Sequence, residues 1–199
     1  MNLIIGTGRC GTGYAAKFLQ ACDIDCRHEK MGGSWLSSWH SASILLPYGP
    51  FKLKDCTESV DIEPVEKVIH LYRHPIEVCS SWVVCKPRAF EYSRFCLNGH
   101  TGNKGDWEAE EKRIEWAMYH YLHWNRLCER FGGDKVVIEN LGKYFGENMG
   151  ITPPKRVERV NSYQEKLGYK RFSTRDFARV NRKLWLQCSD LYNEYRNGA

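Results

Sequence analysis

Apolar residues near the N-terminus form a short run at residues 2–5 (NLII), and this run ends in a glycine-rich segment, GTGRCGTG. The next residues, YAAKFLQAC, place apolar side chains at helical spacing. A strand, a glycine loop and a helix in this order are typical of the start of a phosphate-binding α/β domain. The pattern therefore predicts an α/β fold that begins with this unit.

Three further strands are predicted downstream. A short strand is expected around residues 24–27, and KVVIE at residues 135–139 forms another. The strongest is KVIHLY at residues 67–72, whose nearly continuous apolar character suits a buried parallel strand. The chain is thus expected to form a central parallel sheet of about four to five strands flanked by helices.

The helices are predicted from their start and stop signals. Pro75 suits a first helical position, and a helix is expected from there to about Cys85. The polar segment at residues 87–105 is expected to be a loop. Further helices are expected from an N-cap at Asp106 to about Phe131, ahead of two glycines, and near residues 156–167 and 174–196.

Composition places the chain among globular proteins of one domain. Its 199 residues are 42% hydrophobic, enough for a substantial core, so residues 1–199 are expected to form a single domain. The net charge of +5 is mild and scattered, which indicates a solvated surface or an anionic ligand rather than a nucleic-acid partner. No apolar stretch approaches the roughly 18 residues of a membrane span.

Cysteine usage favours a reducing compartment. The chain has nine cysteines, an odd number, with no CxxC pair and no metal-ligand spacing. The opening MNLII leaves no room for a basic and apolar targeting segment before the glycine loop. We therefore expect a cytoplasmic protein without a membrane anchor, a structural disulfide framework or a bound metal.

The glycine loop has three interpretations. Gly6, Gly8 and Gly11 satisfy the dinucleotide pattern GxGxxG, with Glu29 about where a ribose-binding carboxylate would stand. A nucleotide-kinase loop is disfavoured because Thr12 occupies the lysine position and the strand at 67–72 lacks a magnesium-binding aspartate. The third interpretation uses the cation inside the loop, Arg9.

A second motif favours the third interpretation. Arg73 and Ser81 are eight residues apart in YRHPIEVCSSW, across a strand-to-helix turn. The planar fork of an arginine and a serine hydroxyl placed in this way can bind one phosphate. A nicotinamide dinucleotide would not need this pair.

Together the two motifs resemble those of the sulfotransferases that use 3'-phosphoadenosine 5'-phosphosulfate (PAPS). The segment at residues 6–14 resembles the family's 5'-phosphosulfate loop, and residues 73–82 resemble its 3'-phosphate motif. The similarity covers about residues 2–145, including an aromatic helix with Trp116 and Trp124 and the turn VVIENL. Cys10 replaces the family's usual loop serine, and Asn140 replaces an aspartate. HE followed by SSW is similar to a small bacterial-type subgroup.

The resemblance implies a three-layer P-loop-like domain, with a helical C-terminal part at residues 151–199, and a set of site residues. The residues expected to bind PAPS, or its product PAP, are Gly8, Arg9, Cys10, Gly11, Thr12, Gly13, Tyr14, Arg73 and Ser81. Arg9 is expected to stabilise charge on the departing phosphate. Glu29 is the preferred general base, with His28 beside it as the alternative.

The implied activity is metal-free, in-line transfer of a sulfuryl group from PAPS to a hydroxyl or amine, with release of PAP. The acceptor is a small molecule, a carbohydrate or a peptide, and loops at residues 30–60 and 87–105 are expected to form its pocket. Ser37, Ser38 and Trp39 are candidates to close over the acceptor, and Trp35 or Trp39 is a candidate to stack on it, although aromatic residues at this density more often belong to a core. The alternatives are an NAD-dependent oxidoreductase and a PAP-binding module without turnover.

Overall fold

The computed structural model describes residues 1–29, 33–39, 65–98, 107–155, 157 and 172–197. They form an α/β domain with a five-stranded sheet and helices around it. The elements are β1 (Asn2–Ile5), α1 (Thr12–Gln20), β2 (Cys26–His28), β3 (Trp35–Ser37), β4 (Lys67–Tyr72), α2 (Pro75–Val83), α3 (Pro87–Asn98), α4 (Glu110–Glu129), β5 (Asp134–Val137), the short 3-10 helix η2 (Ile138–Asn140), α5 (Leu141–Met149) and α7 (Thr174–Asn197).

The sheet is parallel throughout, with strand order β2-β3-β1-β4-β5. Its middle strand, β1, is covered on both faces because its apolar residues alternate between two clusters. Ile4 packs with the core that includes α1, whereas Leu3 and Ile5 pack with residues of α4. The α/β fold with a central parallel sheet is therefore confirmed.

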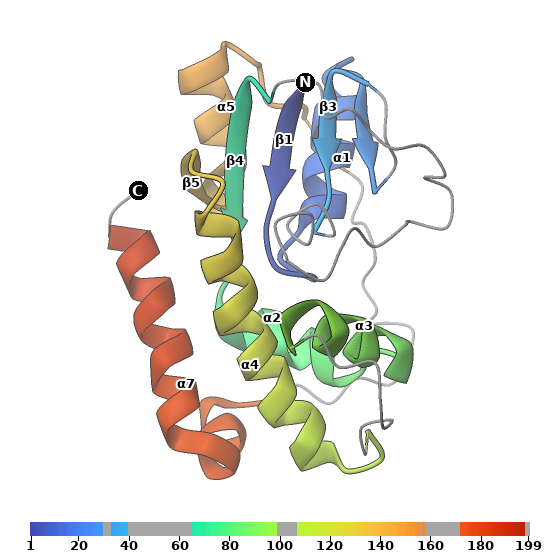
Figure 1. Cartoon of the computed structure of the whole chain (residues 1–199). Coiled ribbons are helices and arrows are strands. Elements are labelled where there is room, and N and C mark those ends of the chain that lie inside the picture. Colours follow the sequence, from blue (N-terminus) through green and yellow to red (C-terminus); the bar gives the residue numbers. More distant parts are fainter. Residues whose placement is uncertain (30–32, 40–64, 99–106, 156, 158–171, 198–199) are drawn as a thin grey trace.

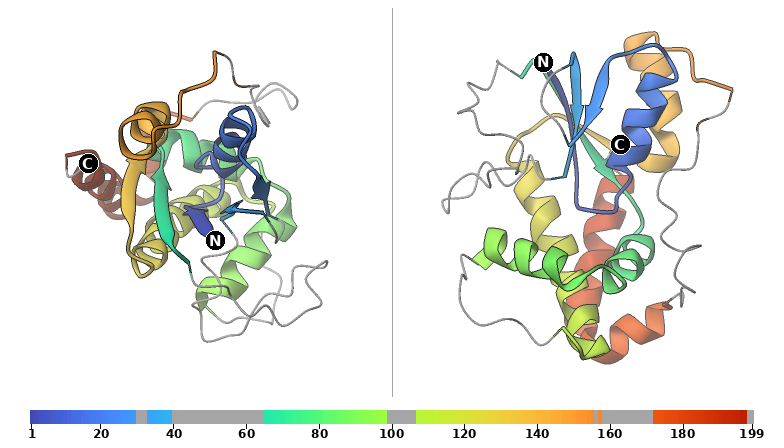
Figure 2. Two further views of the ribbon diagram at one scale, coloured as in Figure 1. Left: turned by 90° about the horizontal axis from the view of Figure 1, so that it is seen from above. Right: turned by 90° about the vertical axis from the view of Figure 1, so that its right-hand side faces the viewer.

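Helices form the outer layers of the domain. Figure 2 shows α1 and α5 together on one side of the sheet, where the rings of Phe18 and Phe145 stack 5.5 Å apart. On the other side α4 carries Trp124, Leu127 and Cys128 against the sheet. Helix α7 packs against α4 and beside the edge strand β5.

The carboxyl ends of the strands share one edge of the sheet, and Figure 1 shows β1 and β4 pointing toward α2. From β1 the chain moves to the β2 side of the sheet, whereas β4 leads to β5 on the opposite side. The adjacent ends of β1 and β4 thus lie at the point where the strand order reverses. Ligands of open parallel sheets bind at such a point.

Several boundaries differ from the sequence prediction. Residues 87–98 were predicted as a loop but form α3, and the three-residue strand β3 was not predicted. Helix α4 begins at Glu110 with Ala109 as its N-cap, while the predicted cap, Asp106, lies outside the described residues. The predicted helix at 156–167 and most of the loop at 30–60 also lie outside them.

The described cysteines are all free thiols, eight of them between Cys10 and Cys188. Most are buried, and burial raises the pKa of the Cys26 and Cys188 thiols to about 12. In the described part of the chain, no helix combines the length and apolar character needed to cross a bilayer.

Candidate functional site

The loop between β1 and α1 is a tight turn followed by a left-handed cap. The Cys10 N–H donates to the Thr7 carbonyl at 3.1 Å, and Arg9 within this turn has φ 73°. Gly11, the N-cap of α1, has φ 114°, and a Cβ there would lie 2.8 Å from the Ile138 side chain. Glycine suits this position because it tolerates positive φ and the close approach of η2.

Helix α2 holds the loop through Trp82. The indole Nε1 of Trp82 donates to the Gly8 carbonyl at 2.8 Å, and a Cβ at Gly8 would lie only 2.9 Å from the Trp82 ring. Trp82 is 1% exposed and follows Ser81 directly. Its role in fixing the loop was not predicted, and the only sequence signal was its position beside a candidate site residue.

The two predicted phosphate motifs meet directly. The Arg9 Nε donates to the Ser81 Oγ at 2.8 Å. Ser81 is 5% exposed in α2, so this hydrogen bond is largely shielded from water. A guanidinium retains further N–H donors when one is engaged, so Arg9 can hold Ser81 and bind an anion at the same time.

Arg73 supplies a second cation at the end of β4. Its Nη2 lies 3.5 Å from the Glu77 Oε2, and its main-chain carbonyl accepts a hydrogen bond from the Tyr121 hydroxyl at 3.1 Å. The Arg73 charge also acts on Cys10, where it opposes the burial that raises the pKa of the thiol to about 12. The Arg73 and Glu77 side chains are about one-third and one-quarter exposed, and their 3.5 Å contact is longer than a good charge-assisted hydrogen bond, so an anionic ligand can compete for Arg73.

The rest of the loop offers main-chain rather than side-chain donors. Cys10 is fully buried, so its thiol points into the core. Thr12 is also buried, whereas Gly13 and Tyr14 are half-buried. Within the described ranges, no side chain caps the start of α1. The first-turn N–H groups of a helix lack partners within the helix and favour an anion.

The candidate bases lie at the same edge of the sheet but farther along it. The His28 Nε2 is 3.6 Å from the Glu29 Oε1, and both side chains are about one-third exposed. Burial lowers the pKa of His28, although the nearby Glu29 carboxylate acts in the opposite direction. Because β3 separates β2 from β1, strand spacing places this pair about 10 Å from the axis of β1.

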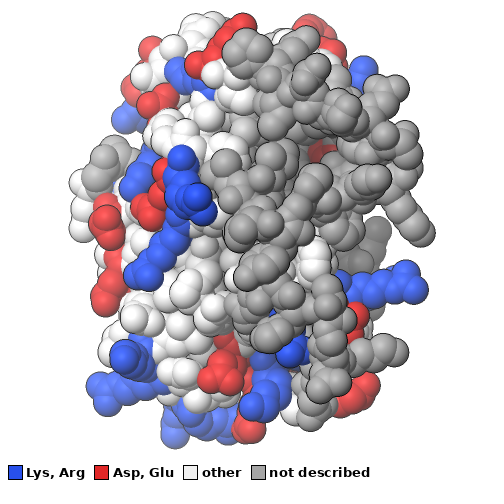
Figure 3. All heavy atoms as spheres, in the orientation of Figure 1, with Lys and Arg blue, Asp and Glu red and all other residues white. Residues whose placement is uncertain are grey.

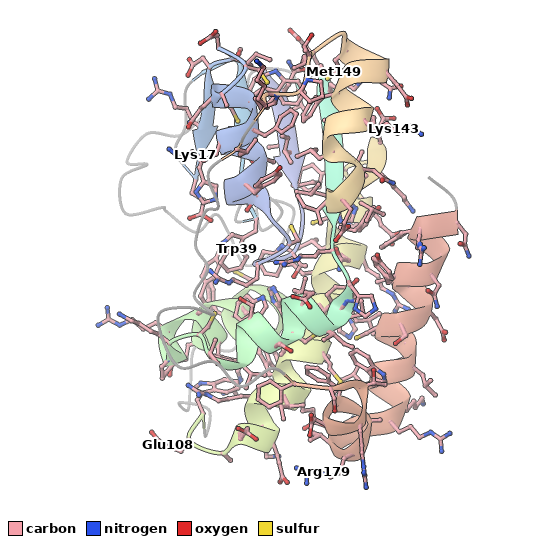
Figure 4. The ribbon with its side chains drawn as sticks, turned by 180° about the vertical axis from the view of Figure 1, so that it is seen from behind. Lys17, Trp39, Glu108, Lys143, Met149 and Arg179 are labelled. Atoms are coloured by element: carbon pink, nitrogen blue, oxygen red, sulfur yellow. The ribbon has the colours of Figure 1, made fainter. Side chains whose placement is uncertain are left out.

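The residues expected to cover the acceptor have structural contacts instead. Trp35 is 4% exposed and packs edge-on against Phe145, and the buried Ser37 Oγ donates to the Thr12 carbonyl at 2.7 Å. Trp39 lies between the sheet and the helices (Figure 4), edge-on to Trp82 at 5.7 Å. These side chains therefore support the glycine loop and the core, which is the role that the density of aromatic residues favours for Trp35 and Trp39.

The groups at this edge of the sheet are of kinds that suit an anion. Arg9 and the buried Ser81 bond each other beside the start of α1, and Arg73 follows the end of β4. Among the described residues, no group of three His, Cys, Asp or Glu side chains is arranged to hold a metal ion. Comparisons with protein-family models, with curated proteins and with solved structures found no match to this chain.

Proposed function

We propose that the protein is a sulfotransferase that moves a sulfuryl group from PAPS to a hydroxyl or amine acceptor and releases PAP. The observation that supports this proposal best is the 2.8 Å hydrogen bond between Arg9 and Ser81. It joins the glycine loop to the segment that follows β4, and Arg73 lies in the same segment. A nucleotide with phosphate at both its 5' and 3' ends matches two neighbouring anion-binding turns.

The proposed binding roles follow from where each donor lies. The main-chain N–H groups between Gly8 and Gly13, apart from that of Cys10, would hold the 5'-phosphosulfate together with the Arg9 side chain. Arg73 and Ser81 would hold the 3'-phosphate, with Arg73 exchanging its 3.5 Å contact to Glu77 for the shorter, charge-assisted bonds of a phosphate. Cys10 would shape the loop rather than bind the ligand, since its side chain is buried and its main-chain N–H donates to the Thr7 carbonyl.

The proposed reaction is a direct displacement at sulfur. The acceptor oxygen or nitrogen forms a bond to sulfur as the bond from sulfur to the 5'-phosphate oxygen breaks, and the acceptor's proton passes to Glu29. PAP leaves with the negative charge that develops on its 5'-phosphate. Arg9 and the loop amides would stabilise this charge, and losing one such donor costs about 3 kcal/mol of transition-state stabilisation.

The strand order argues against the dinucleotide alternative. In the dinucleotide fold β2 is the direct neighbour of β1, which brings the acidic residue at its end to the ribose. Here β3 lies between β1 and β2, so Glu29 stands one strand farther from the glycine loop. The GxGxxG pattern therefore lacks the carboxylate placement that an NAD site would use.

Ligand-induced thermal stabilisation tests the proposal. The protein is heated with PAP, with adenosine 5'-monophosphate and with NADH, and the midpoint of unfolding is compared. A ligand at about one hundred times its dissociation constant adds about 2.7 kcal/mol of stability. We expect a clear shift with PAP, a smaller one with the 5'-monophosphate, and none with NADH.

Two variants test whether PAP stabilises the protein by binding at the proposed site. Arg73→Ala should remove most of the difference between PAP and the 5'-monophosphate, whereas Arg126→Ala, an exposed arginine on α4, should leave it unchanged. Turnover of labelled PAPS with an acceptor panel then separates an enzyme from a PAP-binding module. A shift with NADH and none with PAP would overturn the proposal.

A further inference from the structure

A pocket of about 710 Å³ opens between α3, α4 and α7. Residues of α4 and of the middle of α7 form most of its lining. Figure 4 shows this end of the molecule marked by Glu108 and Arg179, with Lys143 and Met149 at the opposite end. A volume of this size is typical of sites for small ligands.

A break in α7 shapes one side of the pocket. Asn181 has non-helical angles, φ −153° and ψ 92°, in the middle of α7. Its Oδ1 accepts a hydrogen bond from the Leu184 N–H at 3.0 Å, and its Nδ2 donates to the Glu115 Oε1 at 3.1 Å. The side chain of Asn181 thus restarts α7 and ties it to α4, and both residues line the pocket.

Aromatic rings form a wall of the pocket along α4. Trp116, Tyr119 and His123 recur at helical spacing and lie on one face of the helix. Tyr119 stacks on Trp116 at 4.8 Å and lies 4.0 Å from the His123 ring. All three are half-buried and line the pocket rather than fill the core. The three rings pack on one another, so they form a continuous aromatic wall at the side of the pocket.

The charged lining is mostly basic. Arg94 from α3, Lys112 from α4 and Lys183 from α7 line the pocket, against the single carboxylate of Glu115. The two lysines are exposed, so they can reach a ligand without leaving a buried position. Figure 3 shows Lys and Arg side chains along the lower left and bottom of the molecule, with Asp and Glu side chains among them.

We infer that this pocket binds an acidic saccharide, that is, sugar rings that carry carboxylate or sulfate groups. A sugar ring lies on the aromatic wall, its hydroxyls bond the Glu115 and Asn181 side chains, and its anionic groups pair with Lys112 and Lys183. Single-stranded nucleic acid also combines rings with anions. The observations favour the saccharide because the Glu115 carboxylate accepts hydrogen bonds from hydroxyl groups, which a sugar ring carries in number and the backbone of single-stranded DNA lacks.

Direct binding tests the inference without any cofactor, so it stands or falls separately from the proposed function. The probes are a fluorescent heparin tetrasaccharide, maltotetraose as a neutral saccharide and an oligothymidylate of eight nucleotides. We expect the intact protein to bind the heparin tetrasaccharide most tightly. Lys112→Ala/Lys183→Ala should weaken this binding about tenfold, the sum of two exposed ion pairs. Tyr119→Leu should weaken it about fivefold through loss of the flat ring.

Lys143→Ala is the matched control, since Lys143 is an exposed lysine on α5 at the far end of the molecule. It should bind the tetrasaccharide as the parent does. All the lysines replaced are exposed, so each variant should unfold at the parental temperature. Equal loss in the Lys143 control and the pocket variants, tighter binding of the oligothymidylate, or no binding of the tetrasaccharide would each overturn the inference.

Discussion

The Arg9 Nε donates to the Ser81 Oγ at 2.8 Å, across 72 positions of sequence. This hydrogen bond anchors the side chain of a residue whose backbone is left-handed, with φ 73°. Non-glycine residues in this region are strained by about 1–2 kcal/mol and persist where the surrounding structure fixes them. Trp82 and Ser81, successive residues of α2, hold the loop at Gly8 and Arg9, respectively.

Replacing Arg9 in two ways separates its contribution to stability from its contribution to turnover. Arg9→Gly and Arg9→Ala both lose the hydrogen bond to Ser81, but only glycine relieves the left-handed strain. We therefore expect the glycine variant to be about 1 kcal/mol more stable than the alanine variant in chemical denaturation. Both should lose at least about 100-fold in sulfuryl transfer, since neither carries a guanidinium.

A purely structural role for Arg9 would give a different result in these two variants. If Arg9 were held only for packing, the more stable glycine variant would retain more turnover than the alanine variant. Equal and near-parental turnover in both would remove Arg9 from the proposed mechanism. PAP-induced stabilisation, measured on the same samples, shows whether the loss is in binding or in the chemical step.

Gly11→Ala should strongly destabilise the domain. The substitution places a Cβ 2.8 Å from Ile138 in addition to forcing alanine into φ 114°. We expect a loss of about 2–3 kcal/mol in the free energy of unfolding. Gly132→Ala is the control, because Gly132 has φ 68° but nothing within 4 Å of its Cβ position. If the two variants lost equal stability, steric contact with η2 would not matter.

The sequence predicted the elements with strong local signals. The apolar run of β1 before a glycine loop, the apolar β4 and the proline that starts α2 all specify their conformation within a few residues. β3 was missed because three residues are too few to show a period. α3 was missed because the glycines that follow it suggested a loop, although Pro87 at its start was a usable signal.

Local sequence signals could not predict the long-range contacts of the site. Spacing placed Arg73 and Ser81 on one strand-to-helix turn, but nothing in the sequence specified that Arg9 would bond Ser81. Nor did it specify that β3 would enter the sheet between β1 and β2, which sets the distance of Glu29 from the loop. Both depend on strand order, which short apolar runs do not encode.

Acid should destabilise the fold through His70. This residue is 1% exposed, and its Nε2 bonds the Asn125 Oδ1 at 3.1 Å. The Asn125 Nδ2 donates to the Tyr121 carbonyl, so its Oδ1 accepts from a neutral His70. Burial lowers the pKa of His70 from 6.5 to about 3, and the Lys135 charge acts in the same direction while the bond to Asn125 opposes it. A proton on Nδ1 would also find no hydrogen-bond acceptor among the described residues.

The folded state binds the His70 proton more weakly than the unfolded state, so the stabilising effect is complete above pH 6.5 and is lost as the pH falls toward 3. Between pH 6.5 and pH 3, each unit by which the pH falls should lower the free energy of unfolding by about 1.4 kcal/mol through His70. His70→Gln keeps a donor for Asn125 and does not titrate. Denaturation curves at pH 7 and pH 5 should differ less for this variant, and equal differences would contradict a neutral buried His70.

Two substitutions can show whether Glu29 or His28 accepts the acceptor's proton. The two side chains contact each other, but one is a carboxylate and the other an imidazole. Glu29→Gln preserves shape and removes the carboxylate, so it should lower the turnover number at least about 100-fold if Glu29 accepts the acceptor's proton. PAP affinity should remain at the parental value, since β3 separates the pair from the glycine loop. His28→Gln should cost far less, because a neutral imidazole 3.6 Å from the carboxylate would only position it. The reverse order of effects would assign the proton transfer to His28, and a loss of PAP affinity in Glu29→Gln would place this carboxylate in the binding site instead.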